Sequence, residues 1–306
     1  MRIHHGLPEV GLGPAVLTIG SFDGVHLGHQ QVVSQVIEAA GACSSAPVLV
    51  TFEPHPRCVL DPDNCPKSIT TLEEKLALLE QLGVAHSIVI EFTPKLAQLR
   101  AADFMAAIRR SMELRRLVVG FDFALGRRRE GDVDWLRANG GEQGFAVDVV
   151  LPVKAGGQEL HSSNIRQRVA LGDVEGAARL LGRHFTVAGT VHHGDRVGRG
   201  LGFPTVNLAV EPNKLVPGRG AYAGWVRTPT GRHQGAVSIG YRPTFGWTRL
   251  TVEAYLLDFS GDLYGERVEI SFVARLHDDI KFPTPELLAE QIARDVAETR
   301  RILQHV

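Results

Sequence analysis

Short apolar runs alternate with helical patterns over the first half of the chain. Runs typical of buried strands cover residues 15–19, 48–52, 87–91, 117–120 and 146–151. Apolar side chains recur at helical spacing over residues 30–40, and further helical stretches lie near residues 101–112 and 132–138. Strands that alternate with helices predict a parallel sheet covered on both faces. Such sheets bind ligands beyond the carboxyl ends of their strands.

The sequence also marks where two of the helices begin. Thr71-Leu72-Glu73-Glu74 has the pattern of a capping box, and Gly83 is placed to end the helix that it opens. Near the end of the chain, Thr284 is a candidate N-cap and Pro285 occupies the first helical position. We therefore expect one helix after residue 71 and a terminal helix after residue 284.

The pattern changes to strand upon strand after residue 184. Residues 162–183 first have the pattern of two short helices, with Asp173 as the N-cap of the second. Apolar or alternating segments then follow, separated by turns rich in glycine and proline, over residues 185–191, 222–227, 235–239, 250–259 and 268–276. This arrangement predicts an antiparallel barrel with a terminal helix. We expect two domains, residues 1–183 and residues 184–306.

Composition agrees with two domains of a globular protein. The 306 residues exceed the size at which one hydrophobic core stops growing, and 44% of them are apolar. No apolar run reaches the length of a membrane span, and the N-terminus lacks a signal-peptide core. With 33 basic against 34 acidic residues, the chain has no general affinity for polyanions. Cys43, Cys58 and Cys65 show no metal-binding spacing, so we expect thiols in a cytoplasmic protein.

A turn with two histidines follows the first buried strand. Residues 20–29 read Gly-Ser-Phe-Asp-Gly-Val-His-Leu-Gly-His and lead into the helical pattern. The turn places His26 and His29 near a helix N-terminus, where backbone amides attract phosphate oxygens, and Gly28 leaves room for a phosphate. Two imidazoles could stabilise charge that develops on a phosphate. The alternative is a surface turn with incidental histidines, which the position after a buried strand disfavours.

A second candidate phosphate site lies in the predicted barrel. Residues 189–208 are dense in glycine after a strand, and backbone amides of such a loop can surround phosphates. The loop lacks the Gly-Lys-Ser/Thr end of a P-loop, so a plain barrel loop is the alternative. Farther along, the alternation over residues 251–259 places Glu253 on the face opposite the apolar positions. On spacing alone, a solvated strand glutamate is the favoured interpretation.

These segments together resemble bacterial bifunctional riboflavin kinase/FAD synthetases. The resemblance begins in the Gly20–His29 turn and continues through Thr51-Phe52-Glu53-Pro54-His55-Pro56 and Thr71-Leu72-Glu73-Glu74-Lys75. It extends through Gly120-Phe121-Asp122-Phe123-Ala124-Leu125-Gly126 and covers nearly the whole chain in family order. It implies a Rossmann-like nucleotidylyltransferase domain followed by a flavokinase barrel.

For the first domain, the resemblance implies transfer of AMP from ATP to FMN, with release of pyrophosphate. His26 and His29 would contact the ATP phosphates, and Asp122 would lie near the ribose and the metal. His161-Ser162-Ser163-Asn164-Ile165-Arg166 resembles the family's triphosphate-binding motif. The nucleotide-binding residues implied are Gly20, Phe22, Asp23, Gly24, Gly28, Asp122, Ser162, Ser163 and Arg166. Because the FMN phosphate is already ionised at neutral pH, this reaction needs no general base.

For the second domain, the resemblance implies phosphorylation of riboflavin by ATP. Gly-Phe-Pro-Thr-Val-Asn, residues 202–207, resembles the Pro-Thr-Ala-Asn motif of flavokinases, in which Thr205 and Asn207 would hold Mg²⁺ and phosphates. Glu253 would remove the proton from the 5′-hydroxyl of riboflavin, because an alcohol needs such help. The nucleotide-binding residues implied here are Gly194, Gly198, Gly202, Pro204, Thr205 and Asn207.

Several positions depart from the family pattern. Leu125 replaces a usual phenylalanine and His161 replaces a serine in the first domain, and His277 replaces an arginine in the second. The departures at Leu125 and His161 motivate one alternative, a riboflavin kinase whose first domain is degenerate or regulatory.

Two further alternatives come from other protein classes. An RNA enzyme related to class I tRNA synthetases is disfavoured, because the sequence has neither their Lys-Met-Ser-Lys-Ser loop nor an excess of basic residues. The other is a sensor that binds flavin without turnover. Replacement of Glu253 by glutamine would leave flavin binding by such a sensor intact, whereas it would abolish FMN formation by a kinase. We therefore expect an enzyme with riboflavin, FMN and ATP as substrates and Mg²⁺ as cofactor, without nucleic acid or membrane partners; the oligomeric state is left open.

Overall fold

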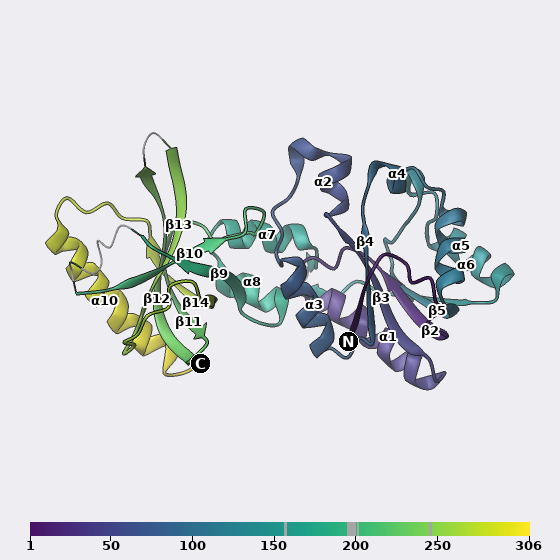
Figure 1. Ribbon diagram of the computed structural model, residues 1–306, viewed down its shortest axis with the longest axis horizontal. Coiled ribbons are helices and arrows are strands. Elements are labelled where there is room, and N and C mark those ends of the chain that lie inside the picture. The colour runs from purple at the N-terminus through teal and green to yellow at the C-terminus, as the bar shows by residue number, and fades with distance from the viewer. Residues whose placement is uncertain (156–157, 195–199, 201, 245–246) are drawn as a thin grey trace. The chain divides into compact units, whose positions relative to one another are not determined.

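The chain folds into two compact units, Met1–Ser162 and Ser163–Val306 (Figure 1). The computed structural model describes residues 1–155, 158–194, 200, 202–244 and 247–306. Helix α7 (Ser162–Ala170) begins at the boundary, and α8 (Val174–Leu181) packs against strands β9 (Phe185–His192) and β14 (Arg267–Asp278) of the second unit. The division of activities between residues 183 and 184 stays a prediction.

The first unit is built on a six-stranded sheet in which every neighbouring pair is parallel. Its strands are β1 (Arg2–His5), β2 (Pro14–Ile19), β3 (Ala46–Glu53), β4 (His86–Glu91), β5 (Glu113–Gly120) and β6 (Ala146–Val150), in the order β1-β4-β3-β2-β5-β6. The predicted parallel sheet is therefore confirmed, and β1 is an additional edge strand. Because β2 pairs with β3 on one side and β5 on the other, chain connections diverge at its carboxyl end. Ligands of open parallel sheets bind at such a point.

Helices cover both faces of this sheet, as the alternation of strands and helices predicted. The longer ones are α1 (Leu27–Ala42), α3 (Leu72–Gln81), α5 (Ala101–Ser111) and α6 (Val133–Gln143). Two separate apolar cores result. One packs α1 and α3 against the sheet, and the other packs α5 and α6 against it. The capping box at the start of α3 is confirmed, since Thr71 and Glu74 each accept the other's backbone N–H.

Short elements complete the first unit between these helices. They are α2 (Pro56–Leu60), η1 (Pro62–Asn64), α4 (Pro94–Ala97), η2 (Arg127–Arg129), β7 (Lys154–Ala155) and β8 (Gln158–Glu159). The expectation of three free thiols is wrong for two of the cysteines. Cys58 and Cys65 form a disulfide bond because α2 and η1 fold back on each other, whereas Cys43 is free and exposed.

The second unit is a closed antiparallel barrel, which confirms the predicted class. Its strands are β9, β10 (Thr205–Val210), β11 (Gly220–Thr228), β12 (Gly231–Thr244), β13 (Trp247–Leu256) and β14, in the order β10-β13-β12-β11-β14-β9. Strand β10 lies where the sequence suggested only a loop. The core centres on Phe185, Tyr222 and Phe272, which are fully buried and in edge or tilted ring contact.

The terminal helix α10 (Pro285–Leu303) packs against β11, β12 and β14. Thr284 caps it and Pro285 opens it, as predicted. Among the helices of the described ranges, none is long and apolar enough to cross a membrane.

Candidate active sites

The histidine turn is found at the carboxyl end of β2, where the sheet's connections diverge. His26 is the N-cap of α1, and its Nδ1 accepts the backbone N–H of His29 at 3.2 Å. The two imidazole rings stack with their centroids 3.6 Å apart. Gly28 leaves the His26 ring its place, because a Cβ at this position would come within 3.2 Å of that ring and press it aside. The turn therefore presents two imidazoles together at a helix N-terminus, where anions bind.

Buried hydrogen bonds hold the backbone of this turn in an unusual conformation. Phe22 and Val25 both have positive φ, 49° and 39°, which side-chain-bearing residues rarely adopt. The Asp23 carboxylate accepts the backbone N–H groups of Ile69 and Thr70 at 2.9 and 3.1 Å. These bonds give Asp23 a part in fixing the turn. Gly24 follows with φ of 85° and contacts Ile69 so closely that a Cβ would clash.

A cavity of about 200 Å³ opens beside the two histidines. Gly20 directly follows β2 and Phe22 packs its ring on His29, while Asp122, His161 and Ser162 line the cavity together with the two histidines. Ser162 donates a hydrogen bond to the Asp23 carbonyl at 3.0 Å. The cavity thus gathers five of the eleven residues expected to bind ATP, namely His26, Gly28, His29, Asp122 and Ser162. Ser163 and Arg166 belong to the second unit.

The first unit has a second, larger cavity that no sequence motif predicted. It has a volume of about 530 Å³ and an aromatic lining of Phe52, Phe92, Phe104 and Phe123. Leu125, which departs from the family pattern, also lines it, together with the exposed turn Arg127–Arg129. Ile19 from the end of β2 contributes to its wall, so it lies on the same sheet edge as the histidine turn. An apolar cavity with a cationic rim suits a flat aromatic ligand that carries a negative charge.

The barrel brings together three oxygen-bearing side chains from two neighbouring strands. Thr205 and Asn207 are two residues apart on β10 and so share one face, and Glu253 of β13 is paired opposite Asn207. The Thr205 hydroxyl donates to Glu253 Oε2 at 3.3 Å. Asn207 and Glu253 are only 7% and 8% exposed. Strand pairing, rather than sequence proximity, therefore places the candidate base beside the candidate nucleotide ligands.

The glycine-dense loop approaches this group from β9. A Cβ on Gly194 would overlap the Asn207 amide at 2.4 Å, so only glycine permits this close packing. Gly202 has φ of 85°, and Pro204 directly precedes β10. Gly198 lies outside the described residues. The described part of the loop therefore borders Asn207, where a phosphate would be expected.

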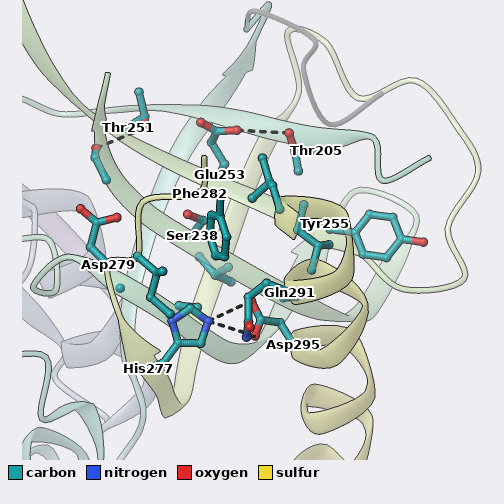
Figure 2. Close-up of a pocket in the computed structure, with 18 of the residues that line it drawn as sticks. Thr205, Ser238, Thr251, Glu253, Tyr255, His277, Asp279, Phe282, Gln291 and Asp295 are labelled. Atoms are coloured by element: carbon teal, nitrogen blue, oxygen red, sulfur yellow. Dashed lines mark hydrogen bonds and ion pairs between the residues drawn. The ribbon is translucent and has the colours of Figure 1, made fainter. Parts of the chain in front are cut away.

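A cavity of about 330 Å³ runs from Glu253 toward the terminal helix (Figure 2). Glu253 and Thr205 lie at one end, and His277, Gln291 and Asp295 lie at the other. His277 Nε2 is 3.0 Å from the Asp295 carboxylate, which also accepts a hydrogen bond from Gln291 at 2.9 Å. His277 departs from the family pattern, and nothing in the sequence pointed to its partners on α10. The cavity is therefore polar at both ends, with apolar Leu288, Ile292 and Phe282 between the barrel and α10.

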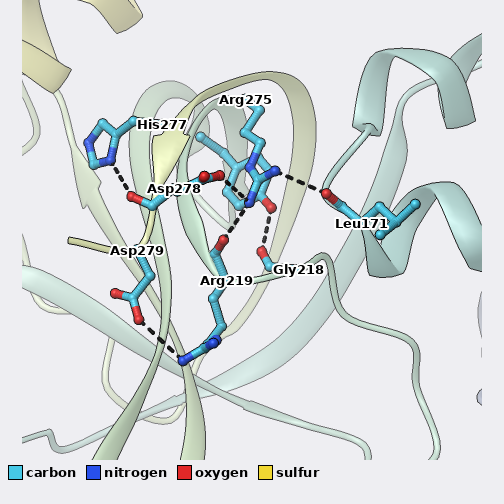
Figure 3. Close-up of polar contacts among 8 residues, drawn as sticks. Leu171, Gly218, Arg219, Arg275, His277, Asp278 and Asp279 are labelled. Carbon is cyan, nitrogen blue, oxygen red and sulfur yellow. Dashed lines mark hydrogen bonds and ion pairs between the residues drawn. The ribbon is translucent and has the colours of Figure 1, made fainter.

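An arginine network fixes the strand end that carries His277 (Figure 3). Arg275 donates to the carbonyl oxygens of Leu171 and Arg219 at 3.0 and 2.7 Å, and its guanidinium pairs with Asp278 at 2.9 Å. Tyr222 donates to the Gly218 carbonyl behind it, and burial raises the pKa of this phenol. These contacts join the α7–α8 turn to β11 and β14, so they hold one wall of the cavity in place.

Comparisons with known proteins agree over both units. Residues 11–164 match the FAD synthetase family, and residues 181–303 match the riboflavin kinase family. A bifunctional riboflavin kinase/FMN adenylyltransferase of Listeria monocytogenes is 37% identical over 93% of this chain and 91% of its own. Its counterpart in Escherichia coli is 35% identical over 98% of this chain and 97% of its own.

A solved structure supports the fold over the same length. It is a crystal structure described as a macrolide-efflux protein from Streptococcus pneumoniae, with 29% identity and a TM-score of 0.87. It covers 97% of this chain and 98% of its own. Two family matches on one chain, with relatives similar from end to end, show that this chain belongs to the bifunctional riboflavin kinase/FMN adenylyltransferases.

Proposed function

We propose that the barrel converts riboflavin and ATP to FMN and ADP, and that the α/β unit converts FMN and ATP to FAD and pyrophosphate. The observation that carries the proposal is the contact between Thr205 and Glu253. It puts a buried carboxylate beside the strand that carries the Pro-Thr-Val-Asn motif. The assignment of residues 1–183 to the adenylyltransferase and 184–306 to the kinase is part of this proposal.

In the kinase reaction, Glu253 takes the proton from the 5′-hydroxyl of riboflavin. The hydroxyl oxygen then forms a bond with the γ-phosphorus of ATP, and the bond from that phosphorus to the β-phosphate oxygen breaks. Glu253 suits this role because it is almost wholly buried at the end of the cavity, where few waters compete for the proton. The polar group His277–Gln291–Asp295 at the other end is available to the heteroatoms of the flavin ring.

Mg²⁺ fits the donor set of the barrel site. Thr205 and Asn207 offer neutral oxygens on one strand face, which together with phosphate oxygens form the hard-oxygen coordination that Mg²⁺ prefers. The part of the chain that the structure describes has no cluster of three or more His, Cys, Asp or Glu that could bind a metal. Substrate phosphates would therefore supply the negative ligands. When bound, Mg²⁺ would neutralise charge that develops on the phosphates.

In the adenylyltransferase reaction, a phosphate oxygen of FMN bonds to the α-phosphorus of ATP and pyrophosphate leaves. His26 and His29 donate hydrogen bonds to the phosphates from the helix N-terminus, with Asp122 and Ser162 across the same cavity. Ser163 and Arg166 would contribute to binding of the triphosphate. The aromatic cavity lined by Phe52 and Phe123 suits the isoalloxazine ring of FMN. Because both reactions consume ATP, we expect the enzyme to work in the cytoplasm.

Chromatography of the flavins tests both reactions at once. Incubation with riboflavin, MgCl₂ and ATP should give FMN first and then FAD. FMN without FAD would select the alternative, a kinase with a degenerate or regulatory first unit, for which Leu125 and His161 are the candidate causes. Absence of both products would refute the proposal.

A further inference from the structure

A lysine side chain is buried beneath the histidine turn. Lys75, on helix α3, is only 5% exposed. Its Nζ donates to the Ser21 carbonyl at 3.1 Å and to the Thr51 hydroxyl at 3.0 Å. The Thr51 hydroxyl in turn donates to the same Ser21 carbonyl at 3.1 Å. The ammonium group, the hydroxyl and the carbonyl therefore form one closed, buried hydrogen-bonded group.

This position is unfavourable for a cation on three counts. Lys75 lies near the N-terminus of α3, where the helix dipole repels positive charge. Burial lowers the pKa of its ammonium group, and this effect outweighs the negative charges of Glu53 and Asp23, which raise the pKa. The two hydrogen bonds that its Nζ donates go to a carbonyl and a hydroxyl oxygen, not to a carboxylate. A buried methionine would fill the space without these costs, so the charge itself requires an explanation.

The hydrogen-bonded group holds the residue next to the strained part of the turn. Ser21 lies between Gly20, which directly follows β2, and Phe22, which has positive φ. The Phe22 ring packs on His29 with the centroids 5.1 Å apart. Fixing the Ser21 carbonyl therefore helps to fix Phe22, and through it the imidazole of His29. Asp23, the residue after Phe22, is held by backbone N–H groups of the segment before α3. The turn is therefore fixed at Ser21 by a side chain of α3 and at Asp23 by the segment that leads into α3.

We propose that Lys75 is a positioning residue of the adenylyltransferase site, which holds the Gly20–His29 turn in its phosphate-binding conformation through Ser21 and Thr51. Its charge lies behind the turn and adds to the positive potential that phosphates meet there. Lys75 lines neither the cavity beside the histidines nor the aromatic cavity, so we place it behind the site rather than in contact with substrate. This inference rests on the proposed adenylyltransferase activity and adds to it a residue that acts through the turn.

Two threonine variants provide a matched test. Thr51→Val removes the hydroxyl from the buried group, while Thr18→Val removes an equally buried hydroxyl on β2 that has no hydrogen-bond partner. We expect Thr51→Val to lower kcat for FAD synthesis about tenfold, because a small misplacement of the turn weakens transition-state contacts. We expect Thr18→Val to stay within about twofold of the wild type, since no hydrogen bond is lost.

Lys75→Met tests the charge directly. It should lower kcat for FAD synthesis about 10²-fold. The KM for FMN should change little, because the aromatic cavity is untouched. A residue that only stabilised the fold would change FAD synthesis in proportion to the folded fraction, with kcat per folded molecule unchanged.

FMN formation by the barrel of the same molecules calibrates the enzyme concentration. Wild-type kcat in Lys75→Met, or equal effects of Thr51→Val and Thr18→Val, would overturn the proposal. If Lys75→Met does not fold, the threonine pair decides. Because the wild type is assayed first, failure of the proposed function would appear separately, as no FAD from any of the proteins.

Discussion

Replacement of Glu253 by glutamine isolates the proton acceptor of the proposed kinase site. Glutamine has the same shape, and its side-chain oxygen can still accept the hydrogen bond that Thr205 donates at 3.3 Å. The change therefore leaves the β10–β13 contact intact and removes only the basic oxygen. General bases contribute about 10²- to 10⁴-fold to the rate. Because Glu253 is 8% exposed, water replaces it poorly, which favours the middle of that range.

We therefore expect kcat for FMN formation to fall about 10³-fold, equivalent to about 4 kcal/mol of transition-state stabilisation. The assay is single-turnover conversion of riboflavin to FMN with saturating MgATP, followed by chromatography. FAD synthesis from added FMN should be unchanged, because it occurs in the other unit. Glu269→Gln on β14 is the matched control, since Glu269 pairs with Arg227 away from the cavity. A loss below tenfold in Glu253→Gln, or an equal loss in the control, would refute the assignment.

Three other changes test the histidine turn and the stability of each unit. His29→Ala should lower FAD synthesis about 10²-fold in steady-state assays while FMN formation persists, and an equal loss of both would contradict the role of the turn. Thr71→Ala should lower the free energy of unfolding of the first unit by about 1 kcal/mol in urea titrations, because the capping box is lost; no measurable change would contradict this. Burial raises the pKa of Asp173, but hydrogen bonds from the Gly176 N–H and Arg168 outweigh burial and hold this pKa below 3.8. Asp173 therefore contributes to the free energy of unfolding above pH 3.8, and this contribution is lost as the pH falls through its folded-state pKa. Asp173→Asn keeps the cap, so it should reduce the loss of unfolding free energy on acidification. An unchanged pH dependence of the unfolding free energy in this variant would contradict the role of Asp173.

The strands that the sequence predicted are those whose apolar residues are consecutive or strictly alternating. Strand β1 was missed because Arg2-Ile3-His4-His5 lies at a sheet edge, where most of its side chains are exposed and no apolar run is needed. Strand β10 was missed because it directly follows a glycine- and proline-rich loop. Its pairing with β9 and β13 is settled by closure of the barrel, which local pattern does not encode.

The residues of the candidate sites also fall into two groups, those that contiguous motifs predicted and those that only the tertiary fold brings together. Family motifs located His26, His29, Thr205 and Glu253, because each motif is contiguous in the sequence. The aromatic cavity draws its phenylalanines from four separate segments, and the His277–Asp295 contact joins a strand to a helix. Such pairings arise only once the tertiary fold is formed. The Cys58–Cys65 bond likewise depends on how α2 and η1 turn, which the spacing of the two cysteines does not encode.

The most direct test of the account follows where each phosphorus atom of ATP goes. The protein is incubated with riboflavin, Mg²⁺ and ATP labelled with ³²P at either the α- or the γ-position, and the flavins are separated. Two sites with different chemistry predict that FMN carries label only from the γ-position. FAD should carry label from both positions, because it keeps the FMN phosphate and gains AMP. FAD without α-label, or flavins without label from either position, would contradict the claim that one chain performs both transfers.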